Sequence, residues 1–456
     1  MDRDARGVAR VIVVIGGGWA GCAAAIELAR HGRRVELHDA APSLGGRARG
    51  VLRDGLPLDN GEHLLLGAYV ETMRVAALVH AGNVASPWIT APLAIRPLSA
   101  QQRNALTLRA RNLPAPLGLL VGLLRARGFT WRERVATIRW FAALRRAEFQ
   151  CANGVTVADV VAPLPPRVRD NLWAPLCIAA LNTPLTEASG QVFLNVLREA
   201  FGGAANAAQM VVARSGLAAA FPEQAADWLR ARGHAVGLSS RLRVIDADDI
   251  RVTDATGTRL ADAVVVAVGP HQLSTAFDPA LATGDAAVAA ALRQVAAFAW
   301  QPIVTAYLGY EASVALPRGL VRLDDSPGQW LFDRGDILRR ATASPSRPAL
   351  GSLLSVVISA HGVHDALDQP ALVAAIDSQL RRLRPSLPPL RWSQVIAEKR
   401  ATYSCVPATT HPPCGRLTGR VYLAGDYTYP AFPATLEAAV RSGVAAARAV
   451  IADVPQ

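Results

Sequence analysis

Three glycines near the start of the chain, Gly16, Gly18 and Gly21, have the spacing that binds the pyrophosphate of a dinucleotide. The first permits a tight turn, the second lets the backbone approach a phosphate, and the third lets the next helix pack closely on the preceding strand. Asp39 comes 21 residues after Gly18, where a carboxylate accepts the ribose hydroxyls. The alternative is a glycine-rich turn in an ordinary α/β protein. The flanking strand, helix and acid favour a nucleotide site, with predicted contacts from Gly16, Gly18, Trp19, Ala20, Gly21 and Asp39.

Two further segments indicate which dinucleotide binds. Gly45, Gly46 and Arg47 follow the second predicted strand, where the glycines can fold over the same pyrophosphate and the arginine can neutralise it. Near the other end, Asp426 lies between a strand and a helix, where it can bond the ribityl chain of a flavin while the helix start faces the ring. Each motif alone is compatible with a turn, but segments about 400 residues apart suit a long ligand, so we expect FAD. The predicted contacts therefore add Gly45, Gly46, Arg47, Val244, Gly425, Asp426, Thr435 and Leu436.

The elements that position these residues form a discontinuous nucleotide-binding domain. Residues 11–15 are a β-branched run typical of a buried parallel strand, residues 22–31 predict a helix, and residues 34–38 predict a second strand. The apolar strands predicted at 263–268 and 421–424 return the chain to the same sheet. We expect an α/β fold: a Rossmann-like FAD-binding domain (1–71, 205–275 and 396–456) with an inserted α+β domain for substrate and membrane docking (72–204 and 276–395).

Positive charge is concentrated in one segment. The chain has a net charge of +12, and between residues 96 and 149 eleven arginines face only Glu133 and Glu148. Residues 113–124 are apolar and uncharged, with Arg109, Arg111, Arg125, Arg127, Arg132 and Arg134 on either side. This pattern suits docking on an anionic membrane surface, with insertion by Leu119, Leu120 and Leu123. The alternative is a buried helix with solvated charges at its ends; nucleic acid is not expected, because no nucleic-acid-binding motif is present.

The cysteines and the lengths of the apolar runs indicate the cellular compartment in which we expect the protein. Five cysteines without a CxxC pair suit reduced thiols in a cytoplasm. Cys405, His411 and Cys414 resemble part of a metal site but lack a fourth ligand at a usual spacing, so we expect no metal. The longest uncharged run, 294–310, has 17 residues and contains a proline, against the ~20 of a spanning helix. We expect a cytoplasmic protein attached peripherally to the inner membrane.

Several segments resemble a known superfamily. Three segments are similar to amine oxidases and phytoene desaturases. They are VIVVIGGGWAGCAAAIELARHG (11–32), LGGRARG (44–50) and VYLAGDYTYPAFPATLEAAVRSG (421–443). Within that superfamily, LDNGEHLLLGAY (58–69) and WAPLCIAALNTP (173–184) resemble the squalene-associated FAD-dependent desaturases, also named hydroxysqualene dehydroxylases. The resemblance implies an FAD domain of the amine-oxidase type. It assigns Gly16, Gly18, Gly21 and Asp39 to the adenosine and pyrophosphate, Arg47 to phosphate, Asp426 to the ribityl chain and Leu436 to the ring.

One departure favours the isoprenoid branch. Amine oxidases usually carry a lysine near flavin N5 on a central strand, whereas residues 300–310 contain none and Lys399 lies in another segment. The resemblance then implies that hydroxysqualene loses its allylic hydroxyl and receives a hydride from reduced flavin N5, yielding squalene for hopanoid or sterol-like lipids. Squalene-pathway synthases are the implied protein partners. The alternatives are a carotenoid or polyprenyl desaturase, which oxidises a C–C bond, and a flavin-stabilised membrane scaffold without catalysis.

Such a reaction needs a proton donor for the leaving hydroxyl and a dry apolar slot. Asp59, Glu62 and His63 place three titratable groups within five residues, and we predict that they are catalytic. The alternative is that Asp59 braces a turn and that His63 is a core residue. Trp173 and Asn182, from the second motif, are predicted to line the slot.

Overall fold

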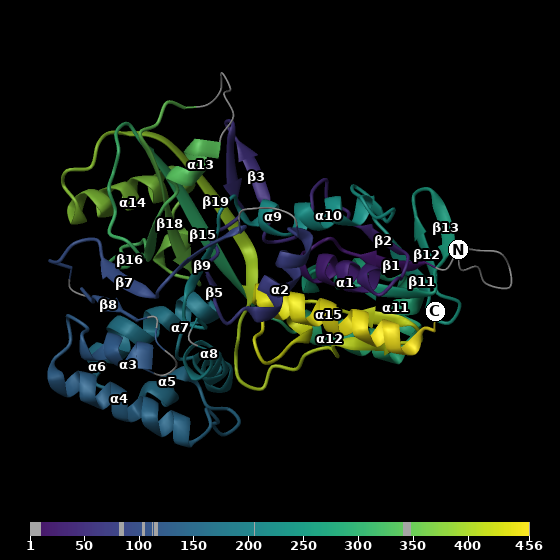
Figure 1. The fold of residues 1–456 in the computed structure, drawn as a ribbon, viewed down its shortest axis with the longest axis horizontal. Helices are drawn as coiled ribbons and strands as arrows, with labels where there is room; N and C mark the ends of the chain where they lie inside the picture. The colour runs from purple at the N-terminus through teal and green to yellow at the C-terminus, as the bar shows by residue number, and fades with distance from the viewer. Residues whose placement is uncertain are drawn as a thin grey trace.

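The computed structural model describes residues 11–81, 86–102, 105–111, 113, 117–204, 206–340 and 348–455. The molecule is elongated and has two parts (Figure 1). The nucleotide-binding domain forms the narrow part, on the right in Figure 1. The second domain forms the broad part and consists of a mixed, mostly antiparallel sheet and a lobe of helices.

A six-stranded sheet forms the centre of the nucleotide-binding domain. Its strand order is β10-β2-β1-β14-β21-β20, and all neighbours are parallel except β20 and β21. Strands β1 and β14 are buried at every residue because these Val- and Ile-rich runs are covered on both faces. Val14 faces one apolar core, and Val13 and Ile15 face the other. The strands are β1 (Ile12–Ile15), β2 (Val35–His38), β10 (Ala235–Gly237), β14 (Ala263–Val266), β20 (Gly415–Thr418) and β21 (Val421–Leu423).

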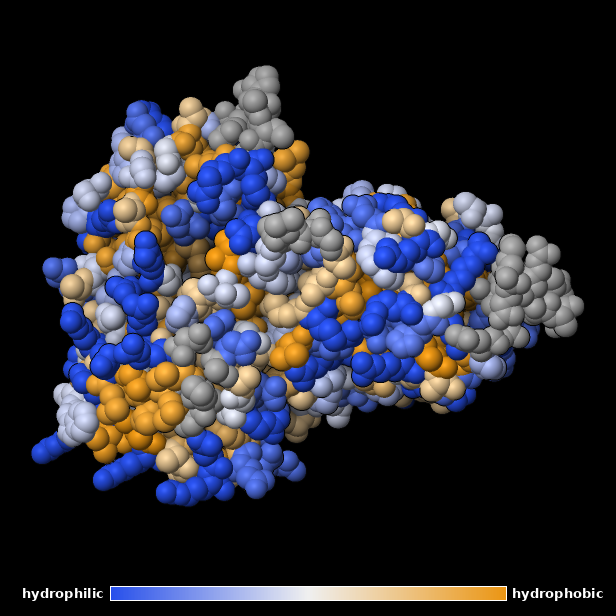
Figure 2. Space-filling view, viewed as in Figure 1, coloured by the Kyte–Doolittle hydropathy of each residue, from blue (hydrophilic) through white to orange (hydrophobic). Residues whose placement is uncertain are grey.

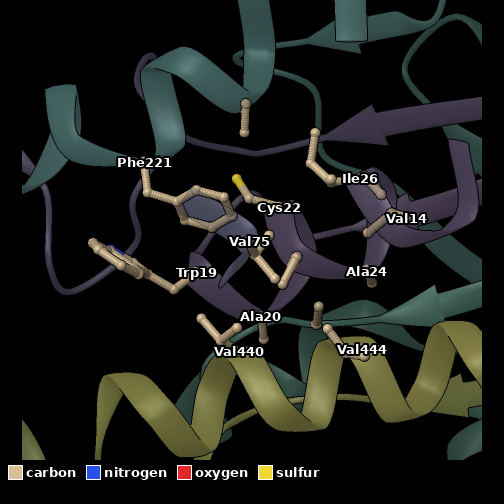
Figure 3. Packing of buried hydrophobic residues seen from close by; sticks show 14 of the residues in the cluster. Val14, Trp19, Ala20, Cys22, Ala24, Ile26, Val75, Phe221, Val440 and Val444 are labelled. Carbon is tan, nitrogen blue, oxygen red and sulfur yellow. The ribbon is translucent and has the colours of Figure 1, made fainter. Parts of the chain in front are cut away.

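Helices α1 (Trp19–Arg30) and α15 (Leu436–Asp453) pack against each other on one face of this sheet. They approach closely because small residues lie at their contact: a Cβ on Gly443 would lie 2.1 Å from the carbonyl oxygen of Ala20. Figure 3 shows Val440 and Val444 directed from α15 toward α1. The other face carries a second core, formed with α11 (Pro279–Gly284), α12 (Ala286–Ala296) and the small sheet of β11 (Arg243–Asp246), β12 (Arg251–Asp254) and β13 (Gly257–Leu260).

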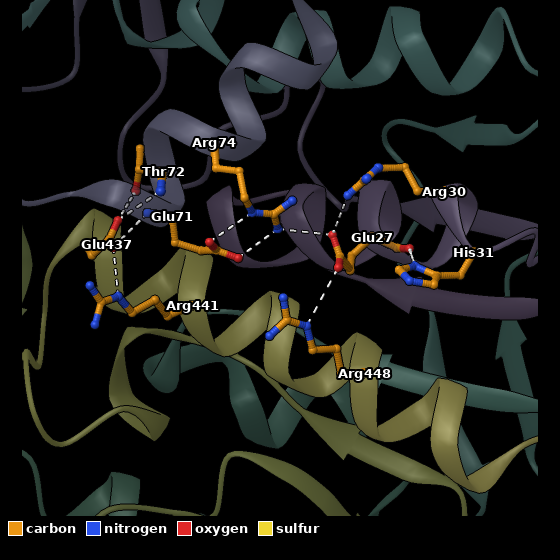
Figure 4. A network of polar contacts seen from close by, with 9 residues as sticks. All are labelled: Glu27, Arg30, His31, Glu71, Thr72, Arg74, Glu437, Arg441 and Arg448. Atoms are coloured by element: carbon orange, nitrogen blue, oxygen red, sulfur yellow. Dashed lines mark hydrogen bonds and ion pairs between the residues drawn. The ribbon is translucent and has the colours of Figure 1, made fainter.

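Ion pairs tie α1 and α15 to α2 (Val70–Val79), as Figure 4 shows. Arg74 of α2 lies 2.7 Å from Glu71 and 3.1 Å from Glu27 of α1. Glu437 of α15 lies 2.7 Å from Arg441 and accepts hydrogen bonds from the backbone N–H groups of Glu71 and Thr72. We call this group the helix ion-pair network; it comprises Glu27, Arg30, Glu71, Thr72, Arg74, Glu437, Arg441 and Arg448.

The second domain is built on a seven-stranded sheet in the order β19-β15-β18-β17-β16-β7-β8. Its long central strand β15 pairs antiparallel with β18 and β19. The strands are β7 (Ala94–Pro97), β8 (Leu108–Arg109), β15 (Trp300–Tyr310), β16 (Leu320–Arg322), β17 (Trp330–Asp333), β18 (Ser352–Ser359) and β19 (Leu390–Tyr403). Shorter neighbouring elements are β3 (Gly50–Arg53), β4 (Leu56–Asp59), β5 (Leu65–Leu66), β6 (Trp88–Ala91), β9 (Met210–Ala213), α13 (Gly335–Arg340) and α14 (Gln369–Leu383).

The helical lobe lies below this sheet in Figure 1. Its core is rich in aromatic side chains, with the ring of Trp173 4.9 Å from that of Trp140 and 6.1 Å from that of Phe193. Thr130 and Glu133 form a capping box at the start of α4. The lobe contains α3 (Leu117–Leu124), α4 (Trp131–Arg146), α5 (Val157–Val161), α6 (Pro166–Val168), a π-helical turn (Arg169–Trp173), α7 (Ala174–Leu181) and α8 (Gly190–Gly202).

The domain boundaries lie elsewhere than predicted in two places. Helix α12, which the prediction assigns to the second domain, packs in the nucleotide-binding core. Strand β19 extends to Tyr403, so residues 396–403 belong to the seven-stranded sheet. Residues 217–230 form two helices, α9 (Leu217–Ala220) and α10 (Pro222–Arg230), because Pro222 starts a new helix. A hydrophobic pattern predicts an element but not the core against which it packs.

Within the described residues, no helix combines the length and the apolar character needed to cross a bilayer.

Candidate functional site

Two glycine loops meet at the carboxyl end of β1. The backbone N–H of Gly45 donates to the carbonyl of Gly17 at 2.8 Å, and Gly18 forms a parallel bridge with Gly45. Gly21 is required by packing, since a Cβ there would lie 1.8 Å from the carbonyl oxygen of Gly16. A Cβ on Gly18 would meet only the Cα of Gly46, at 3.9 Å. The space beside Gly18 is therefore open and lined by backbone.

The start of α1 has no side-chain cap. Its N-cap residue is Gly18, whereas α12, α14 and α15 are capped by Asp285, Asp368 and Thr435. The N–H groups of the first turn of a helix need partners, and an anion is the natural partner for an uncapped start. A backbone-lined gap beside such a helix start fits the pyrophosphate of FAD.

Asp39 lies at the edge of this gap. Its Oδ2 accepts from the backbone N–H of Gly17 at 2.6 Å, and its Oδ1 accepts from that of Ala41 at 2.7 Å. The carboxylate therefore joins the end of β2 to the glycine loop, and its bond to a ribose stays a prediction. Val244 is fully buried in the second core, where its carbonyl accepts from the backbone N–H of Asp278. Its predicted contact with the cofactor stays a prediction.

Arg47 and Asp426 join the two halves of the predicted FAD site. The Nη2 of Arg47 donates to the Oδ1 of Asp426 at 2.6 Å, and its Nη1 donates to the carbonyl of Ala401 at 2.8 Å. The close turn before Asp426 requires Gly425, because a Cβ there would lie 2.3 Å from the ring of Tyr427. The sequence assigned Arg47 to phosphate and Asp426 to the ribityl chain; in the structure each is the other's partner.

A cavity of about 230 Å³ is lined at one end by Thr435, one of the predicted flavin contacts, and extends into the second domain. Phe432, Thr435, Glu437 and Arg441, at the start of α15, form one wall. The rest of the lining is mostly apolar and comes from β5, α7, α8 and the strands β16–β18. It includes Leu64, Leu66, Leu93, Leu176, Ala179, Ala180, Phe193, Val196, Leu197, Ala200, Phe201, Ile303, Leu320, Trp330, Phe332 and Val357.

A buried ionic cluster reaches this lining through Glu62. Arg334 Nη1 donates to both oxygens of Glu62, at 2.7 and 2.6 Å, and the hydroxyl of Ser355 donates to the same carboxylate at 2.9 Å. Arg334 also contacts Asp59 at 3.2 Å and Asp336 at 3.3 Å. Burial opposes the charge of Arg334, but Glu62, Asp336 and Asp59 raise its pKa well above the ordinary value. Glu62 thus presents a fixed carboxylate to an apolar space.

The other predicted catalytic residues lie off the cavity lining. Asp59 accepts hydrogen bonds from the backbone N–H of Leu217 and from Arg334. These bonds fit the alternative given above, in which Asp59 stabilises a turn. His63 is partly buried, and its Nδ1 donates to the carbonyl of Gly61 at 3.0 Å. Of the three titratable groups, Glu62 is the one on the lining.

Trp173 and Asn182 also lie behind the lining. Trp173 is 1% exposed and packs behind Phe193. Asn182 ends α7 in the left-handed conformation (φ 47°); its amide donates to Thr402 Oγ1 and its Oδ1 accepts from the N–H of Ala360. The sequence motif that contains them reaches the cavity through Leu176, Ala179 and Ala180 instead.

Sequence reasoning missed Arg334, Ser355 and the wall contributed by α8. Phe193, Val196, Leu197 and Ala200 follow helical spacing, which was a signal for an apolar face but not for a cavity. No group of three metal-ligating side chains occurs in the described parts of the chain. His411 donates to the carbonyl of Tyr427, Cys414 contacts the carbonyl of Ser442, and Lys399 is exposed on β19.

Comparisons with known proteins show the family to which the chain belongs. The model of the family described as flavin containing amine oxidoreductase matches residues 19–451. A hydroxysqualene dehydroxylase of Rhodopseudomonas palustris is 31% identical over 98% of this chain and 99% of that protein. A hydroxysqualene dehydroxylase of Zymomonas mobilis is 26% identical over 95% of this chain and 97% of that protein. The crystal structure of an oxidoreductase from Methanosarcina mazei shares the fold, with a TM-score of 0.70, 15% identity, and coverage of 95% and 98%. The chain therefore belongs to the flavin-containing amine oxidoreductases, in the branch of the hydroxysqualene dehydroxylases, and is an FAD-dependent oxidoreductase.

Proposed function

We propose that this protein removes the allylic hydroxyl group of hydroxysqualene and yields squalene. The observation that carries the proposal is an apolar cavity that is lined by a fixed carboxylate, Glu62, and by one predicted flavin contact, Thr435. The hydroxysqualene dehydroxylases that match along 95% or more of the chain support it. The squalene would enter hopanoid or sterol-like lipid synthesis, with synthases of that pathway as neighbours.

The apolar lining binds the hydrocarbon chain and excludes water. Each Å² of apolar surface removed from water contributes about 25 cal/mol, so binding needs few polar contacts. Exclusion of water also protects an allylic carbon that gains positive charge as its C–O bond breaks. The walls from α7 and α8 supply these contacts through side chains such as Leu176, Phe193 and Leu197.

The polar groups on the lining act on the leaving hydroxyl. Glu62 accepts a hydrogen bond from it and stabilises the developing positive charge, and Arg334 and Ser355 hold the carboxylate in place. Tyr69 also lines the cavity; burial, and then the charge of Glu437, raise its pKa, so its phenol is protonated before the reaction. It gives this proton to the hydroxyl group as the C–O bond breaks, so that the group leaves as water, and solvent then restores the proton of Tyr69. When bound, reduced FAD supplies the hydride that replaces the hydroxyl group. The glycine loops, Asp39 and the start of α15 would hold it.

Anaerobic mixing of the reduced holoprotein with hydroxysqualene tests this proposal. We expect the flavin to be reoxidised with formation of one squalene per flavin. Glu62→Gln should slow reoxidation about 10²–10³-fold, whereas Glu199→Gln, at another carboxylate on the lining, should leave it nearly unchanged. Reduction of the oxidised flavin by a polyprene would instead indicate a desaturase, and a flavin inert to every lipid would indicate a scaffold. Either result would contradict the proposal.

A further inference from the structure

Helix α3 is apolar on all sides but only half buried. Its eight residues are Leu, Val and Gly alone. Leu119 and Leu123 are 7% and 2% exposed in the core of the helical lobe, whereas Leu117 is 49% exposed and Trp131, at the start of α4, is 63% exposed. Figure 2 shows an apolar area at lower left, over the position of α3 in Figure 1, with hydrophilic residues around it. We call its described residues the apolar face: Leu117, Leu120, Val121, Leu124 and Trp131.

Two glycines set which side of α3 is buried. A Cβ on Gly118 would lie 2.3 Å from the carbonyl oxygen of Arg111, and one on Gly122 would lie 3.0 Å from that of Arg109. The helix therefore lies against the backbone of residues 109–111. This corrects the sequence prediction of membrane insertion by Leu119 and Leu123, because both residues point into the lobe. Of that prediction, Leu120 remains on the outer side.

The exposed arginines around the apolar face have no counter-charge among the described residues. We define the arginine rim as Arg109, Arg111, Arg125, Arg127 and Arg132, all exposed and none joined to a carboxylate in the described parts of the chain. The nearby Glu133 is engaged by the backbone N–H and hydroxyl of Thr130. Arg134 differs: its Nη1 donates to the carbonyl of Leu124 at 2.8 Å and its Nη2 to that of Phe129 at 3.0 Å. It completes the end of α3 and does not belong to the rim.

We propose that the apolar face and the arginine rim dock the protein on an anionic lipid bilayer. Apolar residues surrounded by cations match the acyl and phosphate layers of an anionic leaflet, and an eight-residue helix lies in the interface rather than spanning it. A second copy of this chain fits poorly, since a symmetric contact would bring two arginine rims together. Charge complementarity thus selects the bilayer.

Helix α3, which carries the apolar face, lies next to the wall of the cavity. Gly122 of α3 packs on the Ala110 backbone, whose N–H donates to the carbonyl of Leu93 at 2.8 Å, and Leu93 lines the cavity. One backbone segment therefore separates the docking helix from the cavity wall. If the proposed function holds, this places the membrane, in which hydroxysqualene dissolves, beside the site that uses it; the docking itself does not rest on that function.

Sedimentation of the FAD-loaded protein with vesicles tests the docking. Vesicles of phosphatidylcholine with and without phosphatidylglycerol are compared at low and high salt, without substrate. We expect binding to the anionic vesicles, weakened by salt. The variant Arg125→Gln/Arg127→Gln/Arg132→Gln should bind roughly a hundredfold more weakly at low salt, at about fivefold per arginine. The matched control Arg251→Gln/Arg391→Gln/Arg416→Gln removes the same charge from exposed ion pairs elsewhere and should bind like wild type.

A second variant tests the apolar face separately. Leu117→Ser/Trp131→Ser changes two exposed side chains, so it should fold, keep its flavin and lose the binding that persists at high salt. Equal vesicle binding by wild type and both variants would overturn the proposal. So would self-association, measured by sedimentation velocity, that the Leu117→Ser/Trp131→Ser variant abolishes. Flavin reoxidation in detergent is measured in parallel, so failure to dock is distinguishable from failure of the proposed reaction.

Discussion

In the helix ion-pair network, carboxylates lie 2.7–3.7 Å from arginines of α2 and α15, whereas the arginine rim of α3 has no such partner among the described residues. Both regions contain several arginines. In the first, the positive charges are used inside the molecule to hold three helices together. In the second, they remain available to an external anion. The distribution of carboxylates, more than the number of arginines, separates a structural role from a binding role.

A buried arginine should give the largest effect. Arg334 is 4% exposed and pairs with Glu62, Asp59 and Asp336, so Arg334→Met leaves the buried Glu62 and Asp59 without a counter-charge, whereas Asp336 keeps its pair with Arg340. We expect a loss of about 3–5 kcal/mol in the free energy of unfolding, measured by denaturant titration of the holoprotein. Arg391→Met, at an exposed pair with Glu311, should cost less than about 1 kcal/mol. Equal losses would break the distinction between buried and exposed arginines.

Removing a carboxylate from the network should rank second. Glu437 is 2% exposed and accepts from Thr72 and from the N–H of Glu71 as well as pairing with Arg441. Glu437→Gln should lower the free energy of unfolding by about 2 kcal/mol, because several donors lose a charged acceptor. Thermal unfolding at constant flavin content measures this. The matched change Glu133→Gln, next to the arginine rim, weakens the capping box of α4 but keeps its Thr130 cap, so it should cost less than about 1 kcal/mol.

Acid should weaken the network through Glu71. The hydrogen bond from Arg74 holds the pKa of the Glu71 carboxyl below its ordinary value. A depressed folded pKa gives stability that is fully present above the unfolded value of about 4.3 and is lost as the pH falls through the folded value. The difference in Tm between wild type and Glu71→Gln should therefore be constant near neutral pH and shrink below about pH 4. A difference that persists unchanged in acid would contradict the role of this pair.

The arginine rim should show the smallest effect on stability. Arg125→Gln/Arg127→Gln/Arg132→Gln should leave the free energy of unfolding within about 0.5 kcal/mol of wild type, since no internal contact is lost. Arg134→Gln, in the same segment, should cost about 1 kcal/mol because Arg134 bonds the carbonyls of Leu124 and Phe129. Thermal unfolding of the two variants compares them directly. A larger loss from the triple variant would mean that the rim is structural.

The glycine turns at the predicted flavin site could be predicted from the sequence because their requirements are local. Gly16, Gly18 and Gly21 act within one turn of strand and helix, and Gly425 meets the ring of Tyr427 two residues later. Physical constraints of this range appear as spacing in the sequence.

The cavity and the docking face depend on distant contacts, which a single sequence does not show. Arg334 lies 272 residues from the Glu62 that it holds, and no pattern links the two. Helix α3 is apolar at every turn, so its sequence shows no periodicity that would distinguish Leu123, which is buried, from Leu124, which lies on the apolar face. Gly118 and Gly122, which pack against the backbone of residues 109–111, determine which side of the helix is buried.

The sheet order of the nucleotide-binding domain has a consequence for biosynthesis. Strand β14 pairs with β1 on one side and with β21 on the other, so the sheet unites residues made at the beginning, middle and end of translation. Until residues 421–423 leave the ribosome, β14 exposes an unpaired apolar edge. Helix α1 lacks the cover of α15 until residues 436–453 have also emerged. The second domain has its own sheet and can form earlier, whereas the flavin site closes last. The flavin site, whose glycine motif is among the first residues translated, is therefore the last part of the protein to be completed.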